Sequence, residues 1–251
     1  MENFISAKEI NEVLSLLAKT SLSSDCFFAD KNMKETVITP LISKGYYDAG
    51  EDGESYFCDY ATGTTRFVLF PRNKDFVIKI PFKGQMYRYR MKEEDEAEKI
   101  ECSSFEGAYY NTGEEYTGWD YCDAEEMIYR LAENNRVGQY FLATIRIGEV
   151  NGYPIYAQPL AQVSLFHDRV GAVSQEIQQS TSQVIDAHED VLGEEYLPVE
   201  WAEDFVNVFG EDELDGLLNF LEDMGIADLH DENVGYTGGK PILFDYVGFN
   251  D

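Results

Sequence analysis

The segment that most constrains this chain of 251 residues is its C-terminal run GIADLHDENVGYTGGKPILFDY. Two short apolar runs, residues 234–236 and 241–244, flank a turn that contains Gly-Gly, and this pattern is typical of a tight β-hairpin. Folding the chain about the turn places Asn233 and Asp245 at the same end, about 5 Å apart as cross-strand neighbours. An amide oxygen and a carboxylate this close predict a hard-oxygen site for Mg²⁺, which substrate phosphates would complete.

Another acidic residue, Asp228, lies five residues before Asn233. The order D-x-x-x-x-N followed by a strand-borne Asp resembles the catalytic loop and metal-binding Asp of the protein kinase-like superfamily. The D-L-H-x-x-N form, with Asp245-Tyr246-Val247 in place of D-F-G, is similar to the early serine/threonine protein kinases of podovirus-type bacteriophages. The resemblance implies that Asp228 orients an acceptor hydroxyl and accepts its proton, while Asn233 and Asp245 bind Mg²⁺. The alternative is an ordinary acidic hairpin whose Asp and Asn serve turns.

An apolar run with one lysine, FVIKI at residues 76–80, resembles the kinase strand that carries V-A-I-K. Lys79 in a buried strand is costly unless its charge is paired; alternatively the strand lies at a sheet edge and Lys79 reaches solvent. The preceding run ATGTTRFV keeps only Gly63 and Val68 of the pattern G-x-G-x-x-G-x-V. By this resemblance Lys79 contacts the α- and β-phosphates of ATP, and backbone N–H groups around Gly63 cover the β- and γ-phosphates.

Residues 123–134 (DAEEMIYRLAEN) predict a helix with Asp123 as a candidate N-cap. The resemblance requires a glutamate on such a helix to pair with Lys79. Glu125 is followed by apolar residues at helical spacing, whereas Glu126 aligns with an arginine four residues on, which belongs in water. Glu125 is therefore the preferred partner; alternatively both glutamates are solvated acids of the first helical turn.

Two further strands are predicted in FLATIRIGEV and YPIYAQPL, which an Asn-Gly turn joins. In the kinase order these are the fourth and fifth strands of the small lobe, and the second leads into the hinge. The resemblance implies that Gln158 C=O and Leu160 N–H face the adenine base, with Ala157 behind it. The sequence itself indicates only a strand that ends at Pro159.

These elements predict an α+β fold of the two-lobed protein kinase type. Residues 1–157 would form a β-rich N-terminal lobe that contains an acidic insertion over 86–122, and residues 158–251 would form a reduced helical C-terminal lobe. Gly225 is expected to stop the last long helix. Three helices are expected besides the one with Glu125, over residues 6–19, 172–192 and 211–224.

Charge is distributed unevenly along the chain. It has 19 Lys+Arg against 48 Asp+Glu, a formal net charge of −29, yet residues 66–92 contain eight basic side chains and a single acid. A protein this acidic would repel ATP unless a positive patch received the phosphates; alternatively the basic face docks onto the chain's own acidic segments.

No stretch approaches the roughly 20 apolar residues of a membrane span. Four scattered cysteines are typical of reduced thiols in a cytosolic protein.

We therefore expect ATP- and Mg²⁺-dependent phosphoryl transfer to Ser/Thr of host proteins and of the chain itself, in the host cytoplasm, with no direct nucleic-acid or membrane binding. Only six residues follow Asp245, so a conventional activation segment is not expected. A small-molecule kinase is one alternative, favoured by the D-L-H-x-x-N form. Another is a catalytically degenerate kinase fold that acts as an acidic decoy, or DNA mimic, for a host DNA-binding defence or transcription protein. The acidity could also serve solubility alone.

Overall fold

The chain divides into two compact units in a computed structural model. The first unit comprises Met1–Gly107, Glu115–Asp123 and Thr144–Pro159, and the second comprises Ala108–Glu114, Ala124–Ala143 and Leu160–Asp251. Helix α4 (Gly118–Asn134) contributes to both, which differs from the expected division into residues 1–157 and 158–251. The structure describes residues 4–23, 33–63, 66–82, 87–93, 96–101, 118–164, 173–188, 197–226 and 229–246, with the backbone alone for 87–101 and 118–121.

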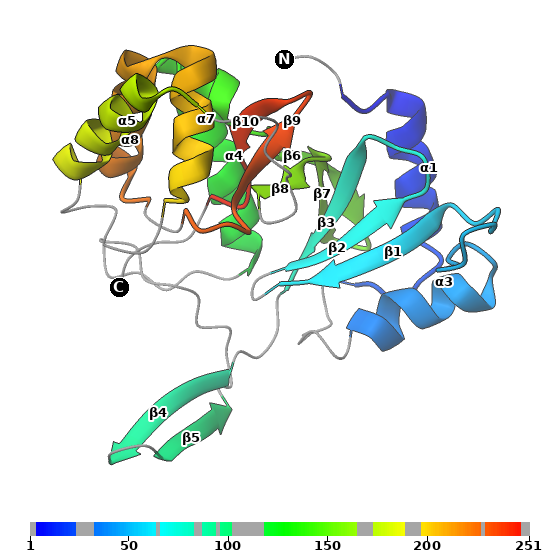
Figure 1. Cartoon of the computed structure of the whole chain (residues 1–251). Helices are drawn as coiled ribbons and strands as arrows, with labels where there is room; N and C mark the ends of the chain where they lie inside the picture. Colours follow the sequence, from blue (N-terminus) through cyan, green and yellow to red (C-terminus); the bar gives the residue numbers. More distant parts are fainter. Residues whose placement is uncertain are drawn as a thin grey trace. The chain divides into compact units, whose positions relative to one another are not determined.

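Five antiparallel strands form the sheet of the first unit in the order β1-β2-β3-β7-β6 (Figure 1). β3 therefore lies at the centre of the sheet. The predicted Asn-Gly turn joins β6 to β7, with φ of 50° at Asn151 and 78° at Gly152, as a type I′ turn requires. The predicted strands are confirmed, and the fold is α+β. The strands are β1 (Phe57–Thr62), β2 (Arg66–Pro71), β3 (Phe76–Pro81), β6 (Ile145–Val150) and β7 (Tyr153–Pro159).

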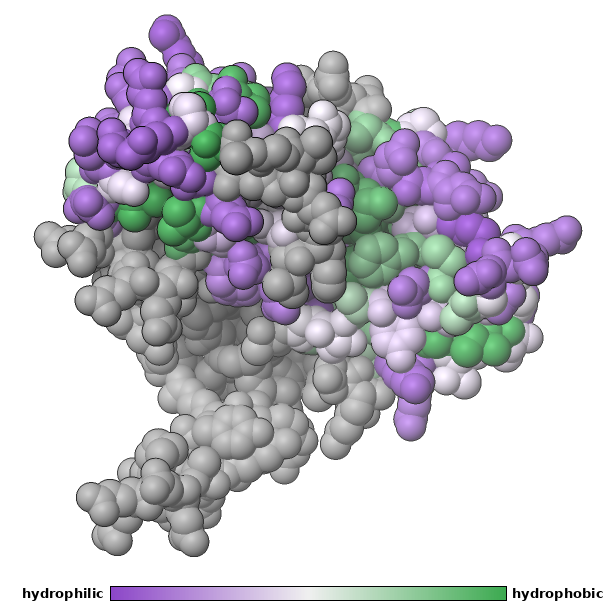
Figure 2. Space-filling model, viewed as in Figure 1, coloured by the Kyte–Doolittle hydropathy of each residue, from purple (hydrophilic) through white to green (hydrophobic). Residues whose placement is uncertain are grey.

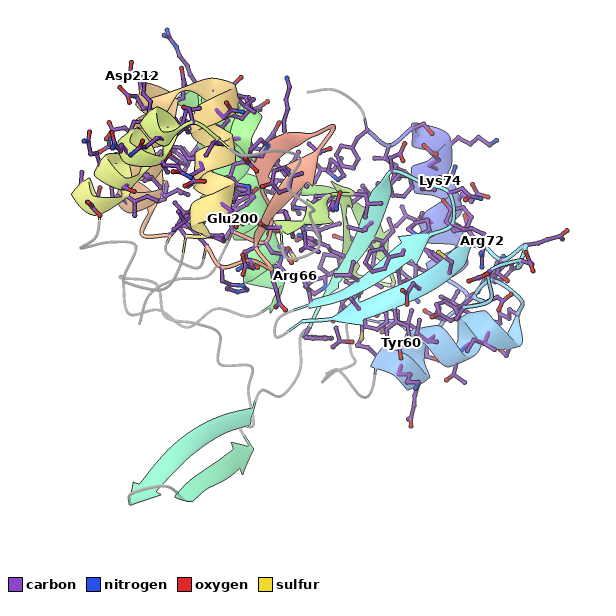
Figure 3. The ribbon with its side chains drawn as sticks, viewed as in Figure 1. Tyr60, Arg66, Arg72, Lys74, Glu200 and Asp212 are labelled. Carbon is purple, nitrogen blue, oxygen red and sulfur yellow. The ribbon has the colours of Figure 1, made fainter. Side chains whose placement is uncertain are left out.

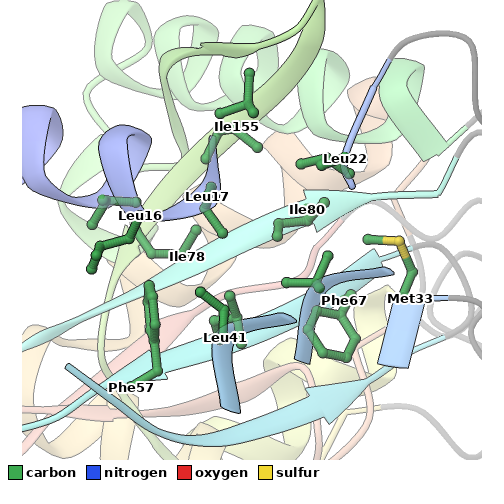
Figure 4. Packing of buried hydrophobic residues seen from close by; sticks show 14 of the residues in the cluster. Leu16, Leu17, Leu22, Met33, Leu41, Phe57, Phe67, Ile78, Ile80 and Ile155 are labelled. Carbon is green, nitrogen blue, oxygen red and sulfur yellow. The ribbon is translucent and has the colours of Figure 1, made fainter. Parts of the chain in front are cut away.

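Side chains alternate along these strands, so the sheet has two different faces. One face is apolar and packs against α1 (Ala7–Leu17), η1 (Lys34–Ile38) and α3 (Thr39–Ser43) in a single buried cluster (Figure 4). The opposite face carries Val68, Lys79 and Tyr156, which are paired across β2, β3 and β7. The N-terminal helices thus cover the apolar face, and the face with Lys79 is the other one. Strand residues of the apolar face include Phe57, Phe67, Leu69, Phe76, Ile78, Ile80, Ile155 and Ala157.

Helix α1 confirms the leading helix expected over residues 6–19. It begins after Ser6, whose hydroxyl accepts a hydrogen bond from the Glu9 N–H, while the Glu9 carboxylate accepts one from the Ser6 N–H at 2.9 Å. This reciprocal capping box satisfies two N-terminal donors of the helix. Part of the 86–122 insertion is regular, because β4 (Tyr87–Glu93) and β5 (Glu96–Glu101) pair as an antiparallel hairpin.

The second unit combines helices with a three-stranded sheet in the order β10-β9-β8. The helices expected over 172–192 and 211–224 are confirmed, and Gly225 ends the latter in the left-handed conformation with φ of 68°. A further helix, α7, was not predicted; its Trp201 indole N–H donates to Gly235 C=O of β9 at 3.0 Å. The elements are η2 (Gly138–Tyr140), β8 (Gln162–Val163), α5 (Gln175–Ala187), α7 (Val199–Phe209), α8 (Glu211–Met224), β9 (Val234–Thr237) and β10 (Lys240–Leu243).

None of the helices in the described part of the chain has both the length and the apolar composition needed to cross a bilayer.

Candidate functional site

The β9–β10 hairpin of the second unit forms as predicted, but its register differs from the prediction. Leu243 pairs with Val234, and the Phe244 N–H donates to Asn233 C=O at 3.0 Å. Phe244 is therefore the cross-strand neighbour of Asn233, and Asp245 lies one position further along. The prediction that Asn233 and Asp245 face each other directly is wrong, because a two-residue Gly-Gly loop makes Thr237 and Lys240 the first pair and fixes every later pair.

Asp245 leaves the hairpin in an unusual backbone conformation. Its φ is 51°, in the left-handed region that residues other than glycine rarely occupy. Such a conformation costs on the order of 1–3 kcal/mol, and residues that keep it are concentrated at functional sites. The backbone no longer follows β10 at this point, so alternation along the strand does not set the direction of the Asp245 carboxylate.

His230 lies against Asn233 and contacts it through both backbone and side chain. The Asn233 N–H donates to His230 C=O at 2.8 Å, and the amide nitrogen of Asn233 lies 3.2 Å from Nε2 of the imidazole. The other ring nitrogen, Nδ1, lies 3.2 Å from the Glu232 N–H donor. A neutral imidazole accepts at only one of its nitrogens, so it accepts either the Glu232 N–H or the Asn233 amide N–H at a time. Asn233 is buried, with 8% exposure.

The Mg²⁺ site expected at this end of the hairpin stays a prediction, and it depends on the chemistry of two side chains. An amide oxygen from Asn233 and a carboxylate from Asp245 are hard ligands, and two protein ligands leave coordination positions for phosphate oxygens and water. Among the residues that the structure describes, no group of three or more His, Cys, Asp or Glu could hold a metal ion as a complete protein cage. The predicted catalytic residue Asp228 lies outside the described residues.

Tyr246 connects the hairpin to α4 within the second unit. Its side chain is fully buried, and its hydroxyl lies 3.1 Å from Glu125 C=O and 3.3 Å from Leu142 C=O. The hydroxyl has one proton, so it donates to one of these carbonyls at a time. The ring meets that of Phe141 edge-on, with centroids 4.9 Å apart. The residue that follows Asp245 is therefore fixed against the backbone of Glu125.

Of the two competing glutamates on α4, Glu125 is the buried one, as predicted. Its exposure is 0%, whereas Glu126 is partly exposed and forms an ion pair with Arg130 at 2.6 Å. The alternative that both are solvated acids is wrong for Glu125. A carboxylate this deeply buried requires compensating partners.

Asp123 is not the N-cap of this helix, contrary to the prediction. α4 already begins at Gly118, and Cys122 is fully buried on the helix, so the buried stripe starts before Asp123. The Asp123 carboxylate instead accepts a hydrogen bond from the Tyr156 hydroxyl of β7 in the first unit. Burial, and then this carboxylate, raise the pKa of Tyr156, so its hydroxyl remains a neutral donor.

Lys79 is almost completely buried, with 1% exposure, on the central strand β3 of the first unit. Val68 of β2 and Tyr156 of β7 are its neighbours on the two sides. The alternative in which Lys79 reaches solvent from an edge strand is therefore wrong. Burying an ammonium group is costly unless anions or several acceptors compensate for the lost water.

Gly63 directly follows β1 (Phe57–Thr62). Its N–H donates to Arg66 C=O at 2.9 Å across residues 64 and 65. Its φ is outside the left-handed region, and a Cβ added to it would lie 3.6 Å from Arg66 O, an ordinary contact. Among the residues that the structure describes, nothing around Gly63 requires glycine, and the missing side chain leaves room for a ligand to approach the backbone.

Gln158 and Leu160 lie at the end of β7 and just after it. The Gln158 side chain is 3% exposed, and its amide donates to the Thr144 hydroxyl at 3.0 Å. Leu160, which begins a stretch of the second unit, is 43% exposed. The adenine contacts expected of their backbone groups stay predictions. Leu160 lines a pocket of about 390 Å³ in the second unit, together with Ala161, Gln162, Tyr236, Thr237, Gly238 and Gly239.

The structure adds three side chains to those that the sequence singled out, two near Lys79 and one near the β9–β10 hairpin. On the first unit these are Arg66 and Tyr156, which share the sheet face of Lys79, and on the second it is the hydroxyl of Tyr246. Of these three residues, Arg66 is the one that the sequence could have indicated, because it stands where the glycine-rich pattern has its third glycine.

Comparisons of the chain with protein-family models, with curated proteins and with solved structures found no match.

Proposed function

We propose that this protein is an ATP- and Mg²⁺-dependent phosphotransferase with a two-lobed, kinase-like fold. Its most direct role is that of a serine/threonine protein kinase acting on host proteins and on itself, in the cytoplasm of a phage-infected cell. The first unit would provide the β-rich lobe that binds nucleotide, and the second the helical lobe that provides the metal ligands and the catalytic Asp228.

The observation that carries this proposal is the burial of Lys79 on the central strand of an antiparallel sheet. A lysine at 1% exposure, on the face opposite the apolar core, has no structural advantage over an apolar residue there. Phosphoryl transfer provides a reason to keep it, since an ammonium group aimed at ATP phosphates neutralises their charge. The strand order β1-β2-β3-β7-β6 is compatible with the expected small lobe.

Each remaining residue then has a role in positioning or charge neutralisation, which provide most of the catalysis in phosphoryl transfer. Buried Glu125 would pair with Lys79 and hold it at the α- and β-phosphates. Asn233 and Asp245 would bind Mg²⁺, which neutralises charge on the phosphates. Asp228 would orient the acceptor hydroxyl and accept its proton.

Transfer of label from γ-labelled ATP tests the proposal. Purified protein with Mg²⁺, alone and with host-cell lysate, should label itself or lysate proteins, and Asp245→Asn should abolish the label while keeping the fold. Label on low-molecular-weight compounds alone would indicate a small-molecule kinase. Equal labelling by wild type and Asp245→Asn would refute the site, and no transfer by the wild type to any acceptor would refute the function.

A second candidate function is supported by the charge of the second unit. No Lys or Arg occurs between residues 170 and 239, whereas 18 Asp and Glu do. Hydrophilic side chains cover much of the visible face of α5, α7 and α8 (Figure 2), and Glu200 and Asp212 extend from it (Figure 3). A surface with this charge is complementary to the basic site of a DNA-binding protein, as a decoy requires.

The decoy function predicts strongly salt-dependent binding to a host DNA-binding protein, because such a partner exchanges its counterions for the acidic surface. Binding should persist in Lys79→Met and Asp245→Asn, which lack the residues of phosphoryl transfer. Loss of binding in those folded variants, or binding that is insensitive to salt, would contradict the decoy function.

A further inference from the structure

We propose that Arg66 is a second phosphate-binding cation, which contacts the terminal phosphates of ATP beside Lys79. The inference deepens the proposed function and rests on it. Arg66 opens β2, and at 5% exposure it is nearly as buried as Lys79. Figure 3 labels it where β2 begins.

The register of the sheet places both cations on one face. Arg66 is opposite Pro81, and Val68 is opposite Lys79. Because directly opposed residues and residues two apart along a strand point to the same side, Arg66 and Lys79 share the face that lies away from the apolar core. They are diagonal neighbours, at a backbone separation of about 7–8 Å.

Two buried cations at this spacing repel each other, and the fold must offset this repulsion in addition to the desolvation of both groups. A polyphosphate that bridges them would convert the repulsion into attraction. The planar guanidinium also matches phosphate oxygens with two parallel hydrogen bonds, which a lysine cannot provide. Both side chains already take part in interactions in the structure, so phosphate would join or replace those partners.

The position of Arg66 indicates which phosphates it would contact. Gly63 donates its N–H to Arg66 C=O at the turn, and the proposed function assigns this turn to the β- and γ-phosphates. Lys79, two positions further along the face, is assigned to the α- and β-phosphates. The guanidinium would therefore replace contacts that a loop richer in glycine provides through its backbone, and it would discriminate ATP from ADP.

Calorimetric titration of ATP, ADP and AMP in the presence of Mg²⁺ tests this assignment. For Arg66→Gln we expect about a 10- to 100-fold loss of ATP affinity, from one charge-assisted contact, with AMP affinity unchanged. The preference for ATP over ADP should therefore fall. Arg66→Lys, which keeps the charge but not the planar fork, should lie between the wild type and Arg66→Gln. Thermal unfolding of each variant checks the fold.

The matched control is Arg146→Gln, which removes an arginine from β6 of the same sheet, where it is paired with Glu149 at the surface. It should leave the ATP-to-ADP ratio unchanged. An unchanged ratio in folded Arg66→Gln, or in Arg66→Lys if the glutamine variant does not fold, would overturn the role of Arg66 alone. A wild-type protein that binds no nucleotide would overturn the proposed function, and the role of Arg66 with it.

Discussion

Three charged side chains, those of Arg66, Lys79 and Glu125, are nearly removed from water, with exposures of 5%, 1% and 0%. Groups of this kind are almost never fully buried unless they are paired, and pairing rarely recovers all the lost hydration. Replacing them with apolar residues of similar size should therefore cost the fold little or even stabilise it, provided that no opposite charge is left behind. Under the proposed function these charges serve to bind phosphate rather than to stabilise the fold.

Gly63→Ala tests function at a residue that the fold does not need as glycine. A Cβ there makes only an ordinary contact with Arg66 O, and alanine loses less backbone entropy on folding. The midpoint temperature of unfolding should therefore stay the same or rise slightly, while ATP affinity falls because the methyl group occupies the approach to the backbone. Differential scanning calorimetry and ATP titration measure the two effects.

Gly235→Ala provides the contrast for that experiment. A Cβ at Gly235 would lie 2.1 Å from Gln162 O, so this variant should be strongly destabilised. ATP affinity that is unaffected by Gly63→Ala would contradict a nucleotide phosphate at the turn.

Tyr246→Phe tests the contact between the hairpin and α4. The change removes a buried hydroxyl that donates to Glu125 C=O or Leu142 C=O and keeps the ring. The free energy of unfolding should fall by about 1 kcal/mol, measured by urea denaturation. Tyr129→Phe is the matched control on α4, since its hydroxyl contacts Glu133 at the surface, and it should have little effect. Equal stabilities of the Tyr246→Phe variant and the wild type would show that the hydroxyl contributes nothing.

At the scale of elements, local patterns were sufficient where the signal is local. The helix expected over residues 6–19, the Asn151-Gly152 turn and the stop at Gly225 each depend on residues close together in the sequence. Helix α7 was missed although Phe205 and Phe209 continue the helical spacing from Trp201. The sequence therefore contains a local signal for this helix.

The parts that could not be predicted depend on residues far apart in the chain. The burial of Arg66 and the hydrogen bond from Tyr156 to Asp123 follow from how strands and helix pack, which no local pattern records. The start of α4 at Gly118 also depends on distant residues, because tertiary burial of Cys122 outweighs an N-cap signal at Asp123. The wrong pairing of Asn233 with Asp245 has a local cause. Counting residues outward from the two-residue turn gives Phe244 as the partner of Asn233.

An ion pair joins helix α1 to the connection between β2 and β3, and it predicts a pH dependence of stability. The Lys74 ammonium donates to the Glu9 carboxylate at 2.8 Å and, with the Ser6 donors, lowers the pKa of Glu9 from 4.5 to about 2. Because the folded-state pKa is depressed, this stabilisation is present above pH 4.5 and is lost as the pH falls towards about 2. Glu9→Gln should therefore be less stable than the wild type at pH 7, with the difference disappearing across that window.

Urea denaturation at a series of pH values measures this difference. Glu12→Gln on the exposed side of the same helix is the control, and its difference from the wild type should be smaller at every pH. A Glu9→Gln difference that stays constant from pH 7 to pH 2 would contradict the assigned ion pair.

At the scale of the whole molecule, the net charge of −29 sets the electrostatic background for every site. Self-repulsion of this size destabilises a compact state and repels anionic ligands. A phosphate ligand would therefore need a local group of cations, such as the pair proposed on one face of the sheet. The acidity of the second unit and the cations of the first are thus separate features with opposite effects on a nucleotide.

Salt should stabilise the protein, because screening weakens repulsion among the acids more than it weakens the few ion pairs. Raising NaCl from about 0.01 M to 0.1 M shortens the Debye length from about 30 Å to about 10 Å. The midpoint temperature of unfolding should rise, by about 2–4 °C for each kcal/mol gained, and KCl should act like NaCl. A midpoint that falls as salt is added would mean that attractive pairs dominate.

The most direct test of phosphoryl transfer compares the rate of phosphate transfer from ATP, in the presence of Mg²⁺, between wild-type protein and Lys79→Met. Arg146→Gln, which removes a charge from the same sheet, is the matched control. We expect transfer by the wild type and by Arg146→Gln, and a loss of at least about 100-fold in Lys79→Met, because several kcal/mol of charge stabilisation at the phosphates are removed. Equal rates in wild type and a folded Lys79→Met would contradict this expectation.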